Sequence, residues 1–354
     1  MINHNTKKIL FAIDTGIIGN IDAFINIMNM TEYDFTICAE RFVLNVMRDD
    51  QKVAGWKLMP YDDIYGSFDK DEAKKLSSEK PFHDGVKGTA RGCRNNKDDY
   101  SKDLFTTASL YLKLRSGLDK IIEQYDAVII PDEFCWNAVA VRDSAQAHGV
   151  PTILNQCGPM HKEGFEFFPA KVDHICAWGK VYYDRFKNDG RKNVYMTGSP
   201  RLDRYYNNTF NKDYPVAYFP TRNPGQFPDY IYDYVDLEVM KFGHIIVQPH
   251  PHQWGLSRHK STEEVICGCD VAISIFSTTL FEAMLVGKPA IQILPKGVES
   301  PIDYPNRFDT AEEAKSFLKK NDLSKQNEWI KERYVCDGDS TIRFMEVIRS
   351  VVNG

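Results

Sequence analysis

The residues best suited to chemistry follow a short apolar run at positions 271–274. Ser277, Thr278 and Thr279 come directly after it, and Glu282 lies one helical turn further on. The first amides of a helix lack partners and its dipole attracts negative charge, so this turn is suited to a phosphate or diphosphate. Glu282 is placed to accept from the two vicinal hydroxyls of a ribose. Helix capping by Ser277, with Glu282 on the surface, explains the same residues without a ligand.

Three further segments carry side chains that donate hydrogen bonds to anions: His250 and His252, Thr221 and Arg222, and Ser199 and Arg201. An imidazole can donate to a phosphate or to a leaving-group oxygen, and a guanidinium can pair with phosphate through two N–H groups. For the two histidines, exposure on an ordinary surface is the alternative. Together with the turn around Ser277, these segments predict an anion site built from several loops.

Short apolar runs alternate with longer helical patterns along the chain, which is typical of βαβ units and parallel sheets. Strands are predicted at 9–13, 35–38, 127–130, 152–154, 174–177, 216–219, 244–247, 271–274 and 290–293. Helices are predicted at 104–124, 137–148, 311–320, 324–333 and 341–352. Because parallel strands present their carboxyl ends at one sheet edge, the loops with anion-binding side chains are expected to meet in a crevice there.

The predicted elements divide into two Rossmann-like α/β domains, 1–204 and 205–354, facing a central cleft. The first domain is expected to bind an acceptor and the second a nucleotide donor, with the last helix packing back on the first domain. Segment 61–102 is rich in polar residues and poor in aliphatic ones. It is predicted to be a solvated insertion or, alternatively, a mobile flap over the cleft.

Composition restricts the class of protein. The chain has 354 residues and a formal net charge of −5, which argues against a protein that coats nucleic acid. Its eight cysteines are scattered without zinc-like spacing, so reduced thiols and no metal site are expected. No apolar run reaches the roughly 18–20 residues that span a bilayer, and no signal sequence is evident. A cytoplasmic protein is expected.

The order of the motifs resembles the CDP-glycerol glycerophosphotransferase family and related capsule and teichoic-acid transferases. The segments that carry the resemblance, between about residues 126 and 343, are TGSPRLD (197–203), YFPTR (218–222), HP (250–251), SIFSTTLFE (274–282), GKP (287–289) and DGDSTIR (337–343). The resemblance implies a GT-B fold. It also implies that Ser277, Thr278 and His250 bind the phosphates of a nucleotide-activated donor, and that Glu282 matches the family's acidic helix residue.

Two positions depart from the family pattern. The family's proposed catalytic base is a histidine after the last strands of its first domain, but the matching position here is Gln156, which cannot accept a proton. Gln248 replaces the lysine that usually precedes the His-Pro motif. The base is therefore expected elsewhere, or catalysis is lost. Asp14 is the first candidate, although it could merely cap a turn. Asp132 and Glu133 are the next candidates, followed by His161.

The sequence thus predicts a metal-independent glycosyltransferase, or a glycerophosphotransferase-like enzyme, without a cofactor. Its donor would be UDP- or CDP-linked and its acceptor a hydroxyl on a glycan or polyol polymer, in the synthesis of a surface glycopolymer. Peripheral contact with a membrane is compatible with this reading. Three alternatives remain: a non-hydrolysing UDP-sugar 2-epimerase, a phage-type DNA-base glycosyltransferase, and a degenerate protein that binds a nucleotide or glycan without turnover. Basic residues at 87–102 motivate the DNA alternative.

Overall fold

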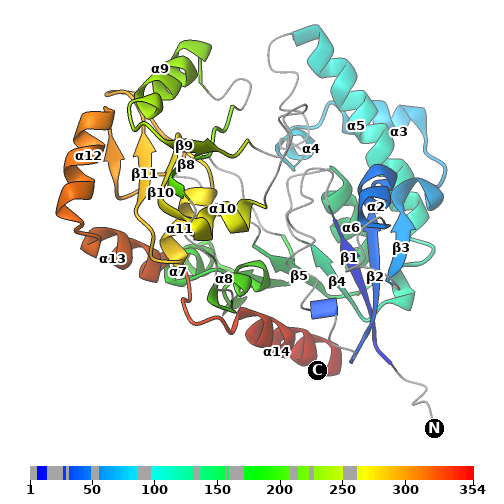
Figure 1. The fold of residues 1–354 in the computed structure, drawn as a ribbon. Helices are drawn as coiled ribbons and strands as arrows, with labels where there is room; N and C mark the ends of the chain where they lie inside the picture. Colours follow the sequence, from blue (N-terminus) through cyan, green and yellow to red (C-terminus); the bar gives the residue numbers. More distant parts are fainter. Residues whose placement is uncertain are drawn as a thin grey trace.

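The computed structural model describes residues 6–13, 27–28, 32–48, 56–85, 97–130, 136–156, 158, 171–207, 214–222, 227–249 and 261–354. Two parallel sheets, one from each half of the chain, form its framework (Figure 1). None of the helices in these ranges is both long and apolar enough to cross a membrane.

The first sheet has seven parallel strands in the order β3-β2-β1-β4-β5-β6-β7. Their bounds are β1 (Lys8–Ala12), β2 (Asp34–Ala39), β3 (Lys57–Pro60), β4 (Ala127–Ile130), β5 (Thr152–Asn155), β6 (His174–Ala177) and β7 (Asn193–Met196). β1, β4 and β5 are buried apart from Lys8, as expected of parallel strands covered on both faces. The five strands predicted in this half are confirmed, whereas β3 and β7 were not predicted because they are short and partly exposed.

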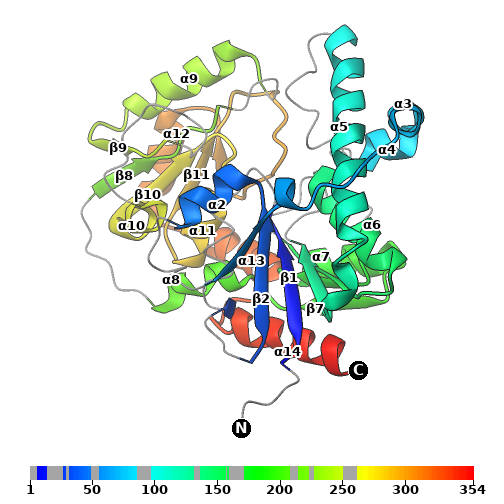
Figure 2. The ribbon, with the colours of Figure 1, turned by 90° about the vertical axis from the view of Figure 1, so that its right-hand side faces the viewer.

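The helices between these strands cover the first sheet. They are α2 (Arg41–Arg48), α3 (Lys70–Leu76), α4 (Lys80–Gly85), α5 (Lys97–Leu118), α6 (Trp136–Ala147) and α7 (Lys180–Asn188), with the single turns η2 (Tyr61–Asp63) and η4 (Ile122–Gln124). In Figure 2, the long helix α5 stands at the side of the molecule, with α3 and α4 beside it.

The polar segment 61–102 is more ordered than the sequence predicted. It contains η2, α3, α4 and the start of α5, and the side chains of Tyr61, Ala73 and Phe82 are buried in the first core. Tyr61 also donates a hydrogen bond from its hydroxyl to the carbonyl of Ile13 at 3.1 Å. These few apolar side chains anchor the described part of the segment to the first core, while its other side chains are exposed or half-buried, and its role as an insertion or flap stays a prediction. Residues 86–96 lie outside the described residues.

The second sheet has five parallel strands in the order β12-β11-β10-β8-β9. They are β8 (Tyr214–Tyr218), β9 (Ile245–Val247), β10 (Cys269–Ser274), β11 (Ala290–Ile293) and β12 (Arg307–Phe308). The accompanying helices are α9 (Asp229–Met240), α10 (Thr262–Gly268), α11 (Thr279–Leu285), α12 (Ala311–Lys320) and α13 (Ser324–Arg333). The four strands predicted in this half are confirmed, and the bounds of α12 and α13 are as predicted.

The connection between the sheets passes through η5 (Pro200–Leu202) and α8 (Arg204–Asn207), and the chain ends in α14 (Ser340–Asn353). Although α14 follows the second sheet, it packs on the first: Phe344, Met345 and Ile348 are buried with Ile9 and Phe11 of β1. Figure 1 shows α14 in red along the bottom of the molecule, reaching beneath β1 and β2. The other face of the first sheet shares a continuous core with residues of the second half, including Phe219 and Phe281.

Candidate functional site

The turn after β10 is fixed by hydrogen bonds to its neighbour β8. The hydroxyl of Ser274 donates to the carbonyl of Phe219 at 2.6 Å and accepts from the N–H of Ser277 at 3.3 Å. Helix α11 begins at Thr279, and Thr278 before it has helical backbone angles and makes no side-chain cap hydrogen bond. Ser277 still serves the helix start, because its hydroxyl accepts from the N–H of Thr279 at 3.3 Å.

The segment after β8 places Thr221 and Arg222 differently. Arg222 is exposed, and its guanidinium donates to Asp236 at 2.5 Å and to Asp233 at 3.1 Å, both on α9. The hydrogen bond to Asp236 is the main reason that the pKa of Arg222 is raised. The guanidinium of Arg222 is therefore already paired with two carboxylates of α9. Thr221, in contrast, is half-buried, and its Oγ1 has no hydrogen-bond partner within the described part of the chain.

Glu282 lies in a buried cluster with Arg201 and Tyr205. Its carboxylate accepts from the guanidinium of Arg201 at 2.7 Å and from the hydroxyl of Tyr205 through the other oxygen. Burial and the charge of Glu282 raise the pKa of Tyr205, so this hydroxyl keeps its proton. Both oxygens predicted to bind a ribose thus have protein partners. The sequence did not single out Tyr205, because nothing marks it apart from its nearness to the 197–203 motif.

Three of the residues predicted to bind the donor carry a buried polar atom without a partner. These atoms are Nε of Arg201, Oγ1 of Thr221 and Oγ1 of Thr279, judged against the described residues. Buried polar groups in folded proteins nearly always have a hydrogen-bond partner. A buried group without one calls for an explanation, such as a bond to a ligand. All three atoms can donate a hydrogen bond, which is what an anion requires.

The contacts of the chain connect these three residues. β8 and β10 are neighbours, and the hydroxyl of Ser274 bonds to the carbonyl of Phe219. Thr221 follows Phe219 by two residues, and Thr279 follows Ser274 by five. Thr279 and Glu282 are three residues apart on α11, hence on one face of it. Arg201 reaches the same face through Glu282. The turns after β8 and β10 and the connector η5 therefore form one candidate site.

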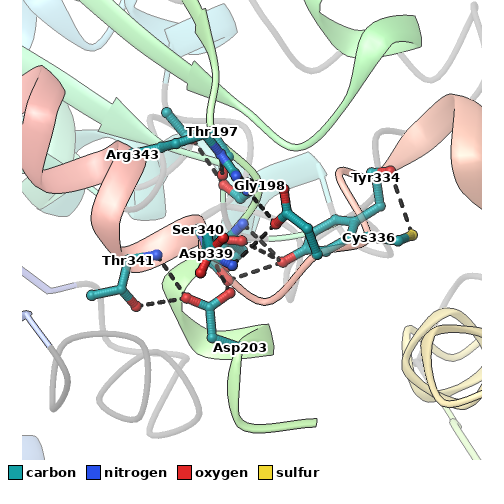
Figure 3. A network of polar contacts seen from close by, with 11 residues as sticks. Thr197, Gly198, Asp203, Tyr334, Cys336, Asp339, Ser340, Thr341 and Arg343 are labelled. Carbon is teal, nitrogen blue, oxygen red and sulfur yellow. Dashed lines mark hydrogen bonds and ion pairs between the residues drawn. The ribbon is translucent and has the colours of Figure 1, made fainter. Parts of the chain in front are cut away.

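The segment 197–203 is tied to the start of α14 (Figure 3). Asp203 accepts from the N–H groups of Ser340 and Thr341 at 3.1 and 2.6 Å, and from the Thr341 hydroxyl at 2.7 Å. Arg343 donates from Nε to the carbonyl of Thr197 at 2.9 Å. We call this set of contacts the α14 latch. The 197–203 and 337–343 motifs therefore dock on each other.

Ser199 and Gly198 belong to the same docking surface. Ser199 is buried, and its backbone N–H and C=O both bond to the hydroxyl of Tyr334 at 3.1 Å. Gly198 has a φ of +76°, and a Cβ there would lie 2.4 Å from Oγ of Ser340. Only glycine fits this close approach. In this arrangement the backbone of Ser199 bonds to protein, and its predicted role in donor binding stays a prediction.

Gln156, at the position where the CDP-glycerol family has a histidine, has a structural role. It is buried, its Oε1 accepts from the N–H of Trp178 at 2.9 Å, and its Nε2 donates to the carbonyl of Gly158 at 2.7 Å. The side chain thereby fastens the end of β5 to the segment after β6. A histidine could not reproduce both bonds with the same geometry.

Several predicted residues lie outside the described residues: Asp14, Asp132, Glu133, His161, His250 and His252. Their roles as base or donor ligand stay predictions. Gln248, two positions before His250, is buried, and its N–H donates to the carbonyl of Tyr218 at 2.8 Å. The segment that leads to His250 therefore starts beside β8.

The sequence matches no family model and no curated protein. Solved structures do match it over almost its whole length. A putative UDP-N-acetylglucosamine 2-epimerase from Listeria monocytogenes is 12% identical with a TM-score of 0.61, covering 98% of this chain and 96% of that one. The glycotransferase of kitacinnamycin is 10% identical with a TM-score of 0.60, covering 98% and 100%.

The wall teichoic acid polymerase TagF is also similar, at 11% identity and a TM-score of 0.53, covering 98% of this chain and 89% of that one. The fold is GT-B. The two parallel sheets with alternating helices agree with this assignment, and the predicted fold class is confirmed. At these identities the likeness extends to the fold alone, so membership of the CDP-glycerol family stays a prediction.

Proposed function

We propose that this GT-B protein transfers a sugar or a polyol phosphate from a nucleotide-activated donor to a hydroxyl acceptor. The observation that carries the proposal is a set of buried donor atoms, on Arg201, Thr221 and Thr279, that have no partner in the described ranges. A diphosphate offers several acceptor oxygens to such a set, and hydrogen bonds to a charged group are the stronger kind. The turn at the start of α11 adds backbone amides to the same place.

The chemistry follows from what these groups can do. The acceptor hydroxyl attacks the donor while a base removes its proton, and the bond to the leaving phosphate breaks. Hydrogen-bond donors aimed at the leaving oxygens lower the barrier, because negative charge grows there in the transition state. In this proposal Arg201, Thr221, Thr279 and the predicted His250 supply the donors. Asp14, Glu133 and His161 remain the candidates for the base.

A UDP-sugar 2-epimerase is the second candidate, and the shared fold of solved epimerases supports it. The epimerase from Listeria has a TM-score of 0.61, and one from Neisseria meningitidis, bound to UDP-GlcNAc, has a TM-score of 0.58. Such an enzyme would use the same donor site without an acceptor. The two candidates therefore share the donor site and differ in the fate of the sugar.

The products distinguish the candidates. Purified protein is incubated with UDP-GlcNAc, UDP-glucose or CDP-glycerol, with and without a glycan or polyol acceptor. Sugar transfer releases a nucleoside diphosphate, transfer of a polyol phosphate releases a nucleoside monophosphate, and both require the acceptor. Epimerisation produces the C2 epimer of the UDP-sugar without an acceptor. A protein that binds these donors but changes none of them would contradict both activities.

A further inference from the structure

A buried polar network lies beneath the turn that follows β10. The hydroxyl of Tyr304 donates to the carbonyl of Ser277 at 2.9 Å, and Nε2 of Gln292 donates to the carbonyl of Ile275 at 2.7 Å. Gln292 and Tyr304 are 0% and 4% exposed. Neither residue stood out in the sequence, since Gln292 lies within an apolar strand and Tyr304 in a loop between Asp303 and Pro305.

The network holds its own members in place. Gln292 is on β11 opposite Ser274 of β10, directly under the turn. Its Nε2 also donates to the hydroxyl of Ser300 at 2.7 Å, whereas its Oε1 has no partner within the described part of the chain. Within the described residues, the side chain of Gln292 therefore forms hydrogen bonds only as a donor. Burial raises the pKa of Tyr304 well above its usual value, so its hydroxyl keeps the proton that it donates.

These bonds set the direction of the backbone amides above them. In a trans peptide the C=O and the following N–H point in opposite directions. The carbonyl of Ser277 is held inward by Tyr304 and by the N–H of Leu280, which donates to it at 3.1 Å, so the N–H of Thr278 faces away from the core. Among the described residues this N–H has no hydrogen-bond acceptor. An anion bound at the start of α11 could accept a hydrogen bond from it.

We propose that Tyr304 and Gln292 are positioning residues that hold the 274–279 turn with its amides directed at the phosphates of the donor. The inference rests on the proposed function and adds two residues that act through the turn. Without them the turn keeps its own bonds, such as that from the N–H of Leu280 to the carbonyl of Ser277, but loses two bonds that hold its peptides from beneath. An amide already oriented needs no reordering when the ligand binds, and this raises affinity.

The test uses Tyr304→Phe and Gln292→Met in the full chain, with Tyr111→Phe as the control. Tyr111 is also a buried tyrosine, and its hydroxyl bonds to Asp143 at 2.8 Å in the first half of the chain. Binding of UDP, CDP and inorganic pyrophosphate is measured by calorimetry at a temperature where each variant is folded. We expect both turn variants to bind each ligand, including pyrophosphate, about fivefold to tenfold more weakly. This is the change in affinity that the loss of one hydrogen bond produces.

The control separates positioning from stability. Tyr111→Phe should lose comparable stability to urea yet keep wild-type affinity for all three ligands. Wild-type affinity in Tyr304→Phe and Gln292→Met would overturn the positioning role while leaving the proposed function standing. A wild-type protein that binds none of the three ligands would overturn the proposed function and this inference with it. If one variant does not fold, the other decides, and Ser300→Ala, which removes an acceptor of Gln292, serves as a third.

Discussion

Thr221 and Thr279 each have a hydroxyl that is buried from solvent and has no hydrogen-bond partner among the described residues. An unsatisfied buried hydroxyl lowers the free energy of unfolding, whereas an apolar group of the same shape does not. In an enzyme such a cost is tolerated where a ligand completes the bond. The two threonines therefore lend themselves to a comparison of stability with binding.

Thr221→Val and Thr279→Val should leave the free energy of unfolding unchanged or raise it by up to about 1 kcal/mol, since each removes an unsatisfied group. Urea denaturation of the ligand-free protein measures this. The matched control is Thr341→Val, because the Thr341 hydroxyl donates to Asp203 at 2.7 Å. The control should lose about 1 kcal/mol. A comparable loss in the two site variants would mean that their hydroxyls already have partners.

Residue types at strand ends predict which loops form the candidate site, but they do not predict how its side chains pair. Thr221 and Thr279 were identified from the sequence, because hydroxyls after parallel strands suit an anion. The sequence could not show that Arg222 would form ion pairs with two aspartates of α9. Nor could it show that Arg201 would pair with Glu282. Those pairings depend on which helices pack beside the loops, and local patterns do not encode this.

The α14 latch ties helix α14 to the connector between the two halves of the molecule. Asp339 flanks α14 without a side-chain cap, and Asp203 from the connector supplies the acceptors instead. A distant carboxylate thus takes the place of a local N-cap. The sequence placed this helix correctly but did not predict its cap, which comes from residues more than a hundred positions away.

Asp203→Ala should lower the free energy of unfolding by about 1–3 kcal/mol, because it removes the cap and leaves the N–H groups of Ser340 and Thr341 without an acceptor. Chemical denaturation gives this value. Asp339→Ala is the control, since the side chain of Asp339 makes no cap hydrogen bond. Equal effects of the two substitutions would contradict the assignment of the cap to Asp203.

The ion pair between Asp337 and Arg343, beside the latch, should weaken in acid. Hydrogen bonds from Arg343, at 2.7 and 2.9 Å, are the main reason that the pKa of Asp337 is lowered. A carboxylate with a lowered folded-state pKa stabilises the fold above its unfolded pKa, about 3.9, and loses that effect as the pH falls through the folded pKa.

Asp337→Asn should therefore be less stable than the wild type at pH 7, by less than about 1 kcal/mol because the pair is partly exposed. The difference should shrink as the pH falls below about 4. Denaturation of both proteins across this range measures it. A difference that stays constant down to low pH would show that the charge of Asp337 is not its source.

At the scale of the whole molecule, aromatic side chains join the two halves into one core. Trp178, after β6, has its ring 5.1 Å from Phe281 of α11 and 5.9 Å from Tyr334. Phe281 is fully buried and also lies 5.8 Å from Tyr334. Hydropathy patterns predicted two sheets, because strand burial is local. They could not predict this shared core, which depends on how the sheets face each other.

Phe281→Ala should lower the free energy of unfolding by about 3–5 kcal/mol, the range for a buried phenylalanine. Since the core is shared, tryptophan fluorescence and circular dichroism should report one common transition in the wild type. Two transitions that separate by probe in the wild-type protein would contradict a joint core. Phe105→Ala, at an exposed position, is the control and should change stability little.

The central claim is that Arg201 of the connector, together with Thr221 and Thr279 of the second half, binds the phosphates of a nucleotide-activated donor. The most direct test is a calorimetric titration of the wild type and of the Thr221→Val/Thr279→Val variant with UDP, CDP, GDP and dTDP. We predict that the wild type binds at least one of the four, and that the variant, folded and no less stable, binds it at least about tenfold more weakly. Equal affinity in the two proteins, or no binding by the wild type, would contradict the claim.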